Sequence, residues 1–510
     1  MTSPDVLGDG AVAAGKADRP SRTEKADRKA EKKAARALRA DDREAARGLP
    51  TGRGIELVLL AFAAVIVTGA LVLVEANQEE ELTRALIYVG AAYLGLFTIA
   101  HFAVRKLAPY ADPLMLPCVA LLNGLGLVMI HRLDLAATDR AVALGREVPT
   151  ELIQRQVAWT AIGLALFVGV LVVVRNHRTL ARYGYTAGFA GLVLLALPGL
   201  LPSSISEVNG AKIWLRLGIF SIQPGEFAKI ALIIFFSVFL VQKRDLFSDA
   251  GRKFLGMEFP RARDLAPLLI AWGLSIGVLV LERDLGTSLL FFGIVLVLLY
   301  TATGKASWMV IGLAFFIGGG VVAYQLFGHV RTRVQIWMDP FADFNGAGYQ
   351  IGQALFGLGT GGIGGTGLGA GRPDLVPYAE SDFMLSTLGE ELGLVGLSAI
   401  LVVYLVLITR GLRSALAVRD SFGKLLATGL AFTLALQLFV VAGGATKLIP
   451  LTGLTLPFLS YGGSSLVANY ALVALLLRVS NAARTPLPTR PQAPLKPLAE
   501  AGTELVERRP

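Results

Sequence analysis

Residues 329–391 read HVRTRVQIWMDPFADFNGAGYQIGQALFGLGTGGIGGTGLGAGRPDLVPYAESDFMLSTLGEE, and they interrupt an otherwise apolar sequence. The stretch lies between hydrophobic runs long enough to span a bilayer and is far longer than a median connection of about 4 to 6 residues. Residues 357–371 have glycine at nearly every second position, so their backbone can approach a ligand closely and has little preference for a regular element. We therefore expect a working site whose walls are helices and whose lining is loop.

Composition indicates a polytopic membrane protein. Hydrophobic residues make up 54% of the 510 residues, charged residues 17%, and the mean hydropathy is +0.60. The single cysteine, Cys118, lies in an apolar run, which excludes a disulfide framework, and no two of the four histidines have metal-ligand spacing. Neither a zinc site nor a nucleic-acid partner is expected.

Two terminal segments have a different composition. Residues 1–54 are rich in Ala, Lys, Arg, Asp and Glu, with no apolar stretch able to bury a core, and they lack the pattern of a secretory signal. We expect a disordered, basic cytoplasmic tail that could attract anionic lipids. The proline-rich residues 481–510 are expected to form a second disordered cytoplasmic tail.

Twelve apolar runs between the tails predict an all-α fold, because a membrane span needs roughly 17 to 25 residues. They cover residues 55–74, 85–104, 114–130, 157–174, 183–200, 227–241, 265–281, 285–301, 306–327, 383–409, 422–441 and 461–477. The polar residues 328–385 form a large loop between the ninth and tenth runs.

Positive charge orients these runs, since Lys and Arg concentrate in alternate loops. Those loops contain Arg105, Lys106, Arg175, Arg178, Arg182, Lys243, Arg244, Arg252, Lys253, Arg261, Arg263, Lys305, Arg410, Arg413, Arg419 and Lys424. We expect these loops and both termini in the cytoplasm, with residues 75–81 and 328–385 outside. A substrate of the long loop must then be present on the outer face, away from ATP and nucleotide sugars.

Ionisable residues beside apolar runs are candidates for a site, because burying charge near a bilayer is unfavourable. Glu226 and Lys229 in IQPGEFAKI lie on one helical face, where an internal ion pair is the alternative. Glu282 and Asp284 in LERDLGTS lie in an outer turn between two runs, where we expect their charges to be solvated. Lys447 precedes a Pro- and Gly-interrupted segment that fits either a broken helix lining a cavity or a simple helix-entry turn.

With these pieces placed, residues 114–480 resemble the shape, elongation, division and sporulation (SEDS) family of bacterial cell-wall polymerases. The blocks that carry the resemblance are NGAKIWLRLGIFSIQPGEFAKI from Asn209, ERDLGTS from Glu282, the stretch from Arg331 through DP at Asp339 to GYQIGQALFGLGTGGIGGTGLG, VPYAESDF from Val376, GEELGLVG from Gly389 and PLTGLTLPFLSYGGSS from Pro450. The resemblance implies a ten-helix core made by the third to twelfth runs. Residues 55–113 would then be two additional N-terminal helices.

Within the family, LLNGLGLVMIHRLD and ERDLGTS resemble the rod-shape (RodA-type) members more than the division (FtsW-type) members. Three residues depart from the family pattern beside the blocks: Gly225, Glu282 and Arg283. They put local geometry in doubt more than activity.

The resemblance implies an inverting peptidoglycan glycosyltransferase for cell elongation, working on the outer face of the bacterial cytoplasmic membrane. Its substrate would be lipid II, an undecaprenyl-pyrophosphate-linked disaccharide pentapeptide, which it polymerises into glycan strands. Its implied partner is a class B penicillin-binding protein that crosslinks the strands. A lipid II flippase or an FtsW-like division polymerase is the alternative.

Asp382 occupies the position of the family's catalytic aspartate, which implies a general base. An attacking sugar hydroxyl needs a base for its proton, and a pyrophosphate leaving group needs cations. An N-cap is the structural alternative, because aspartate before an apolar run is a favoured cap. The candidate substrate-binding residues are Glu226, Lys229, Arg331, Arg333, Arg372 and Lys447, of which the cations could instead pair with Asp339, Asp343 or Glu380. The glycine run lacks the ending of a P-loop, no cofactor is assigned, and a divalent cation (Mg²⁺ or Mn²⁺) is left open.

Overall fold

The computed structural model describes residues 51–78, 84–148, 150–208, 210–217, 220–243, 252–254, 257–259 and 266–486. The tails predicted for residues 1–54 and 481–510 fall almost entirely outside these ranges, as does most of the cationic connection at residues 244–265. Helix α17 (Gly463–Arg484) extends four residues beyond the predicted start of the C-terminal tail.

In the described part of the chain, eleven helical segments are long and apolar enough to cross a membrane. Besides α17, they contain α2 (Arg53–Asn77), α3 (Arg84–Leu107), α4 (Met115–Ala143), α5 (Leu152–Val173), α6 (Gly184–Leu200) with the preceding 3-10 helix η1 (His177–Tyr183), α8 (Pro224–Gln242), α11 (Leu285–Thr303), α12 (Ser307–Leu326), α15 (Met384–Ala417) and α16 (Ser421–Ala445). Helix α10 (Ala266–Glu282) has 17 residues and coincides with the remaining predicted run. The predicted all-α, polytopic membrane fold is confirmed.

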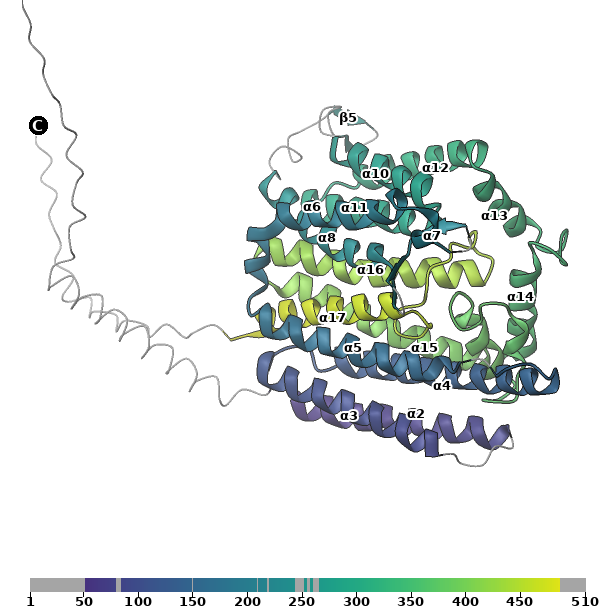
Figure 1. Ribbon diagram of the computed structural model, residues 1–510. Helices are drawn as coiled ribbons and strands as arrows, with labels where there is room; N and C mark the ends of the chain where they lie inside the picture. Colours follow the sequence, from purple (N-terminus) through teal and green to yellow (C-terminus); the bar gives the residue numbers. More distant parts are fainter. Residues whose placement is uncertain are drawn as a thin grey trace, which may run out of the picture. The chain divides into compact units, whose positions relative to one another are not determined.

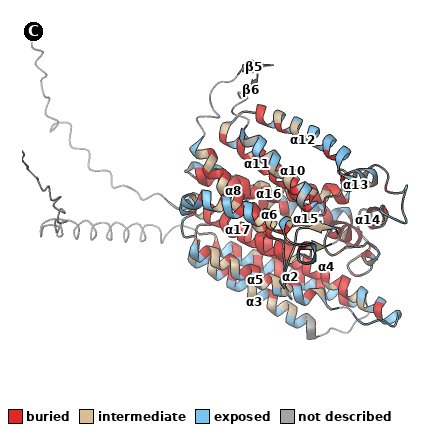
Figure 2. Ribbon diagram, turned by 45° about the horizontal axis from the view of Figure 1, so that its top comes forward, coloured by how far each residue is buried: buried red, intermediate tan, exposed pale blue. Residues whose placement is uncertain are grey.

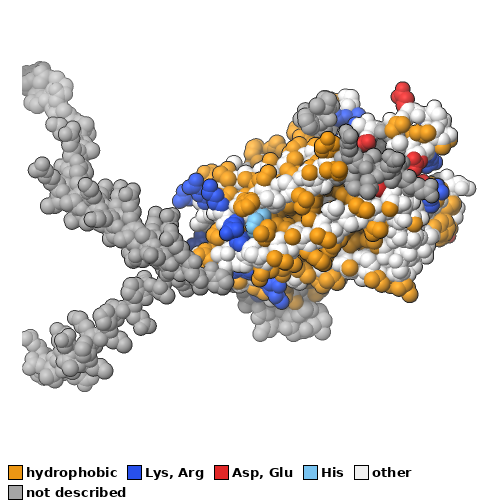
Figure 3. Space-filling view, turned by 90° about the horizontal axis from the view of Figure 1, so that it is seen from below, with side chains coloured by type: hydrophobic (Ala, Val, Ile, Leu, Met, Phe, Trp, Pro, Cys, Tyr) orange, Lys and Arg blue, Asp and Glu red, His pale blue; other side chains and the backbone are white. Residues whose placement is uncertain are grey.

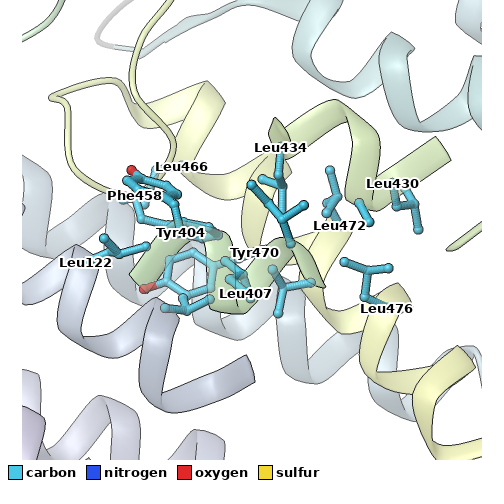
Figure 4. Close-up of a cluster of buried hydrophobic side chains, with 14 of the residues drawn as sticks. Leu122, Tyr404, Leu407, Leu430, Leu434, Phe458, Leu466, Tyr470, Leu472 and Leu476 are labelled. Atoms are coloured by element: carbon cyan, nitrogen blue, oxygen red, sulfur yellow. The ribbon is translucent and has the colours of Figure 1, made fainter. Parts of the chain in front are cut away.

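Helix α17 is enclosed by its neighbours and packs against α5, α15, α16 and α8 (Figures 1 and 2). Tyr404 on α15 and Tyr470 on α17 are fully buried, and the Phe458 ring meets Tyr470 edge-on at 5.4 Å between centroids (Figure 4). Gly163 lets α5 approach, since a Cβ there would lie 2.5 Å from the Tyr470 ring. Because lipid tails are as apolar as these side chains, close packing rather than escape from water stabilises this core.

Helices α2 and α3 lie at one side of the bundle, with α2 against α4 and α3 against α5 (Figure 1). Buried charges near one end of this pair have partners. Arg53 donates to Glu56, and Glu56 contacts His101 Nδ1 at 2.8 Å. Asp112, fully buried before α4, is paired with Arg484 at the end of α17. Such pairing is required where charge is removed from water.

The long polar loop contains regular structure that the sequence interpretation did not expect. Two helices, α13 (Gly328–Met338) and α14 (Tyr349–Gly361), occupy it, followed by the short η3 (Pro373–Leu375). The prediction that the lining is loop is therefore wrong for these residues. Glycine in α14 permits packing rather than disorder: a Cβ on Gly357 would lie 2.9 Å from Glu390 of α15. The helix ends where Gly362 adopts φ +52°.

Two further boundaries differ from the predictions or refine them. Helix α4 continues to Ala143 instead of ending near residue 130, because its polar residues are paired: Arg132 Nε lies 3.1 Å from Glu391, and Asp134 accepts from the Ile153 N–H at 2.8 Å. Residues 446–462 between α16 and α17 are irregular, as the interrupted sequence indicated.

The four-residue helix α7 (Ser203–Ser206) and three short antiparallel hairpins complete the described structure. The hairpins pair β1 (Glu207–Val208) with β2 (Ala211–Lys212), β3 (Leu215–Leu217) with β4 (Phe220–Ile222), and β5 (Arg252–Phe254) with β6 (Met257–Phe259). The first two lead directly into α8, whose Pro224 opens the helix at a position where its missing N–H is harmless.

Candidate active site

Several segments distant in sequence meet at the end of the bundle that carries residues 327–383, which we call the loop face (Figure 1, right). It contains the beginnings of α8, α11, α15 and α17, the helix α13, and the irregular residues 446–462. Each contributes a helix, a helix end or non-helical backbone.

Asp382 lies in a tight turn directly before α15. Its N–H donates to the Tyr378 carbonyl at 3.1 Å, and Tyr378 itself has φ +57°. The turn is fixed to residues 446–462 by two hydrogen bonds: Ser460 Oγ donates to the Ser381 carbonyl at 2.6 Å, and the Tyr461 N–H donates to the Glu380 carbonyl at 2.7 Å. These contacts fix the backbone that carries the carboxylate.

The Asp382 carboxyl group is partly buried, and its surroundings favour the protonated form. Burial raises its pKa to about 6, and the negative charges of Glu380 and Asp284 act in the same direction. A hydrogen bond from Ser381 and the positive charge of Arg333 oppose that rise. The N-cap of α15 is Phe383, and no side chain caps this helix, so the cap interpretation of Asp382 finds no hydrogen bond to support it.

Arg333 on α13 is the cation that the structure brings to this carboxylate. Its Nη1 donates to the Leu451 carbonyl at 2.9 Å, and its charge acts on both Asp382 and Asp284. Trp337, one turn further along α13, donates its indole N–H to the Lys447 carbonyl at 3.0 Å. Helix α13 is thus docked on the irregular segment with Arg333 near the acidic groups.

Asp284 is a buried carboxylate that the sequence interpretation assigned to a solvated turn. It is 8% exposed and caps α11, accepting from the Thr287 N–H at 2.9 Å and from Thr287 Oγ1 at 2.6 Å. Burial raises its pKa despite these bonds. Glu282 is 4% exposed, so the solvated interpretation is wrong for both acids, whereas Arg283 between them is exposed with φ +58°. No local signal in ERDLGTS could have indicated burial, because apolar spans flank a solvated turn in the same way.

Glu226 and Lys229 form an ion pair of 2.5 Å in the first turns of α8. Lys229 is 2% exposed and also lies 3.3 Å from Gln437 Oε1 and 3.4 Å from Asn469 Oδ1. This geometry is that of an internal ion pair, which the sequence analysis gave as the alternative to a substrate-binding role. Glu226 lies close enough to Asp284 for its charge to raise the pKa of that group, so the pair borders the acidic site.

The other predicted cations are spread over the loop face. Arg331 is exposed, donates to the Gln325 carbonyl at 3.1 Å and lies 5.7 Å from the centre of the Tyr324 ring. Arg372 is exposed and forms two hydrogen bonds with Asp374, at 3.2 and 3.3 Å. Lys447 is partly buried with φ +61°. Arg372 thus pairs with a loop carboxylate, but this is Asp374 and not Asp339, Asp343 or Glu380.

An apolar pocket of about 150 Å³ lies between α10, α11 and α12, beginning at the residue after Asp284. Its lining includes Leu285, Ser288 and Phe292 on α11 and Phe316 and Phe327 at α12. Helix α12 is largely exposed (Figure 2). Among the described residues, no three His, Cys, Asp or Glu side chains converge to hold a metal ion.

Comparisons with known proteins give consistent matches. The family model described as a cell cycle protein family (FtsW, RodA, SpoVE) matches residues 112–485. The peptidoglycan glycosyltransferase RodA of Mycobacterium tuberculosis is 59% identical over 460 residues, which is 90% of this chain and 97% of that protein. The probable peptidoglycan glycosyltransferase FtsW of Trichlorobacter lovleyi is 33% identical over 385 residues, 74% of this chain and 94% of that protein.

Two solved structures extend the comparison. A chain from a study of the structural coordination of polymerization and crosslinking by a peptidoglycan synthase complex is 29% identical, with a TM-score of 0.57, covering 73% of this chain and 98% of its own. The rod shape determining protein RodA of Thermus thermophilus is 26% identical, with a TM-score of 0.50, covering 72% and 96%. The family model begins at residue 112, after α3. The alignment with the Mycobacterium tuberculosis protein covers 90% of this chain, so it must include nearly all of α2 and α3.

Proposed function

The chain belongs to the FtsW, RodA and SpoVE family, and from this premise we propose that it polymerises lipid II into glycan strands with Asp382 as the general base. The resemblance to SEDS polymerases is confirmed. The protein is a multi-pass membrane protein and a peptidoglycan glycosyltransferase of the RodA type, since its RodA relative is 59% identical and its FtsW relative 33%. The substrate, the base, the membrane orientation and the partner are parts of the proposal.

The observation that carries the proposal is the placement of Asp382 on a rigid turn with Arg333 nearby. In an inverting transfer, the acceptor hydroxyl attacks the anomeric carbon and loses its proton to the base, while the pyrophosphate leaves with the bonding electrons. A carboxylate with a pKa of about 6 is mostly ionised at neutral pH and is a stronger base than an ordinary aspartate.

Arg333 is our first choice among the predicted phosphate ligands. A guanidinium group suits bidentate contact with pyrophosphate oxygens, and the charge of Arg333 on α13 already acts on Asp382 and Asp284. The pocket between α11 and α12 begins one residue after Asp284 and suits the first isoprene units of the lipid. A lipid tail there would bring its pyrophosphate to Arg333 and its sugar toward Asp382. Arg331, Arg372 and Lys447 remain predicted ligands around this centre.

We place the loop face outside the cell. The connections at the opposite end contain the cationic residues of the alternate loops that the structure describes. Figure 3 shows a cluster of Lys and Arg at one end of the apolar surface, and acidic side chains together with further Lys and Arg at the other. A single cysteine in place of Asp374 should react with an impermeant maleimide in intact cells, and one in place of Arg419 should not. The reverse pattern would refute an extracytoplasmic site.

The proposed partner is a class B penicillin-binding protein. Support comes from the related chain whose structure belongs to a peptidoglycan synthase complex that couples polymerization and crosslinking. Co-purification of such a transpeptidase with the full-length chain would test the assignment.

The deciding experiment is glycan-strand synthesis from purified lipid II by the full-length protein. Asp382→Asn keeps the shape of the side chain and removes its basic oxygen, so polymerisation should fall by about 10²- to 10⁴-fold. Asp139→Asn, at an exposed carboxylate of α4, is the matched control and should be unchanged. Near-normal synthesis by Asp382→Asn would dismiss Asp382 as the base. Lipid II translocation without synthesis, lost in Asp382→Asn, would favour the flippase alternative.

A further inference from the structure

The last turn of α2 holds the glycine segment of the long loop, residues 366–371, by its backbone. Asn77 Nδ2 donates to the Leu368 carbonyl at 2.5 Å, and Gln78 Nε2 donates to the Gly369 carbonyl. Gly369 has φ +82°, and a Cβ there would lie 3.0 Å from both the Val74 carbonyl oxygen and Asn77 Cβ. A side chain at residue 369 would therefore crowd the end of α2 and strain the backbone.

The same segment is held on its other side by α15. The carboxylate of Glu391 accepts from the Gly369 N–H at 3.0 Å, and its carbonyl accepts from the Gly367 N–H at 2.9 Å. Glu391 also accepts from Arg132 Nε at 3.1 Å, while Arg132 Nη2 donates to the Gly371 carbonyl at 2.8 Å. The segment therefore lies between the end of α2 and the first turns of α15, with α4 beneath it.

A second acid of α15 extends this connection. Glu390 accepts from the Thr366 N–H through its carbonyl at 3.0 Å and from the Arg372 N–H through its carboxylate at 2.7 Å. Helix α15 has non-helical backbone at Gly393, with φ +65°. The residues before that break, from Met384, thus form a short helical section attached to the loop, and Asp382 lies two residues before it.

Helix α2 itself is well anchored. Its Glu75 is 1% exposed and lies 3.1 Å from His131 Nε2 on α4. Asn77 and Gln78 lie outside the family model, which begins at residue 112. Two related structures are matched over 96 to 98% of their own length, and the matches cover only 72 to 73% of this chain. The hairpin of α2 and α3 is thus an addition to the matched core, and it reaches the loop that carries the site.

We propose that Asn77 and Gln78 are positioning residues, through which the added hairpin holds residues 366–371 and the first turns of α15 so that Asp382 is correctly placed. The proposal rests on the proposed function, because positioning is measured as polymerisation. Without the two amides, the loop loses its hold on one side only, so the fold persists while the base samples unproductive positions. A misplacement of about 1 Å can reduce a rate by up to about 100-fold.

The test compares Asn77→Ala/Gln78→Ala with wild type in the full-length chain, using glycan synthesis from lipid II. We expect kcat to fall about tenfold with KM changed less than about twofold, since the amides touch the loop and not the substrate. Hydrogen exchange at residues 362–371 should accelerate, and the melting temperature should stay close to wild type. Gln154→Ala removes an amide whose one side-chain hydrogen bond among the described residues is to neighbouring Glu151, and it should leave all three measurements unchanged.

A second pair of variants separates the contact from backbone strain. Gly369→Ala places a methyl group against α2, whereas Gly210→Ala has the same φ of +82° with no atom within 4 Å. Only Gly369→Ala should lower kcat and accelerate exchange in the loop. If wild type makes glycan and the Asn77/Gln78 double variant turns over normally with a loosened loop, the contact is structural and the proposal fails. A selective rise in KM would also refute it, and an inactive wild type would refute the proposed function itself.

Discussion

The raised pKa of Asp382 should make this residue a source of instability that its removal relieves. The pKa is about 6 in the folded protein and 3.8 for the ordinary group, so the folded state binds the proton more tightly than the unfolded chain. Between pH 3.8 and 6 the unfolded chain then carries fewer protons, and stability falls as pH rises. The stability that the folded state gains by holding the proton on Asp382 is fully present below pH 3.8 and lost above about pH 6.

The size of the effect follows from the same two values. The difference, 6 − 3.8 = 2.2, corresponds to about 3 kcal/mol at about 1.4 kcal/mol per unit. This is an upper bound, because the carboxyl group keeps some contact with solvent. Asp382→Asn has no charge to bury, so the variant should be more stable than wild type at pH 7.5. For a chain of this size we expect a melting temperature higher by up to about 3 °C.

The assay is thermal unfolding in detergent from pH 4 to 8, with polymerisation measured on the same samples. The two melting curves should converge near pH 4, while the wild-type rate should be half-maximal near pH 6 and about a tenth of maximal at pH 5. The exposed-site control Asp139→Asn should show neither effect. If Asp382→Asn melts at or below the wild-type temperature at pH 7.5, the burial argument is refuted. If the wild-type rate does not change between pH 5 and 8, Asp382 is not the titrating base.

Two further predictions test the residues around the base. Arg333→Gln should raise the pKa of the proposed base above 6, because it removes the cation that lowers it; the acidic limb of the rate profile should move to higher pH, whereas Arg331→Gln should leave that limb in place. Gly126→Ala should lower the melting temperature and the rate together, because its Cβ would lie 2.4 Å from the backbone oxygen of Leu459 in the segment that holds the catalytic turn. Gly169→Ala on α5 meets nothing within 4 Å and should behave as wild type. Normal activity in Gly126→Ala would show that this segment does not hold the turn.

The helices could be predicted from sequence because lipid imposes a simple rule. Every spanning backbone must satisfy its own hydrogen bonds, so an apolar run of sufficient length is a helix, as all twelve runs are. The same rule fails beyond the membrane. Helix α4 continues past residue 130 because Arg132 and Asp134 find partners on other elements, and hydropathy has no access to those partners.

The site could be predicted only in part, for a related reason. Asp382 lies next to an apolar run in a block with a family resemblance, and both signals are local. The position of Arg333 depends on α13 docking onto residues 446–462, more than 100 residues away, and no local pattern encodes that contact. Asp284 was misjudged because a short charged motif between two spans has the same sequence whether the turn lies in water or under a helix.

The glycines of residues 357–371 allow the close approach that the sequence predicted, but they approach other parts of the protein and not a ligand. Glycine does permit close approach here, but the partners are protein: Gly357 meets Glu390, and Gly369 meets the end of α2. A flexible cradle for phosphate would need free N–H groups, whereas the N–H groups of Gly367 and Gly369 are already bound to Glu391. The loop is therefore fastened between α2 and α15. Of the cations predicted for the leaving group, Arg333 is the one whose charge acts on both Asp382 and Asp284.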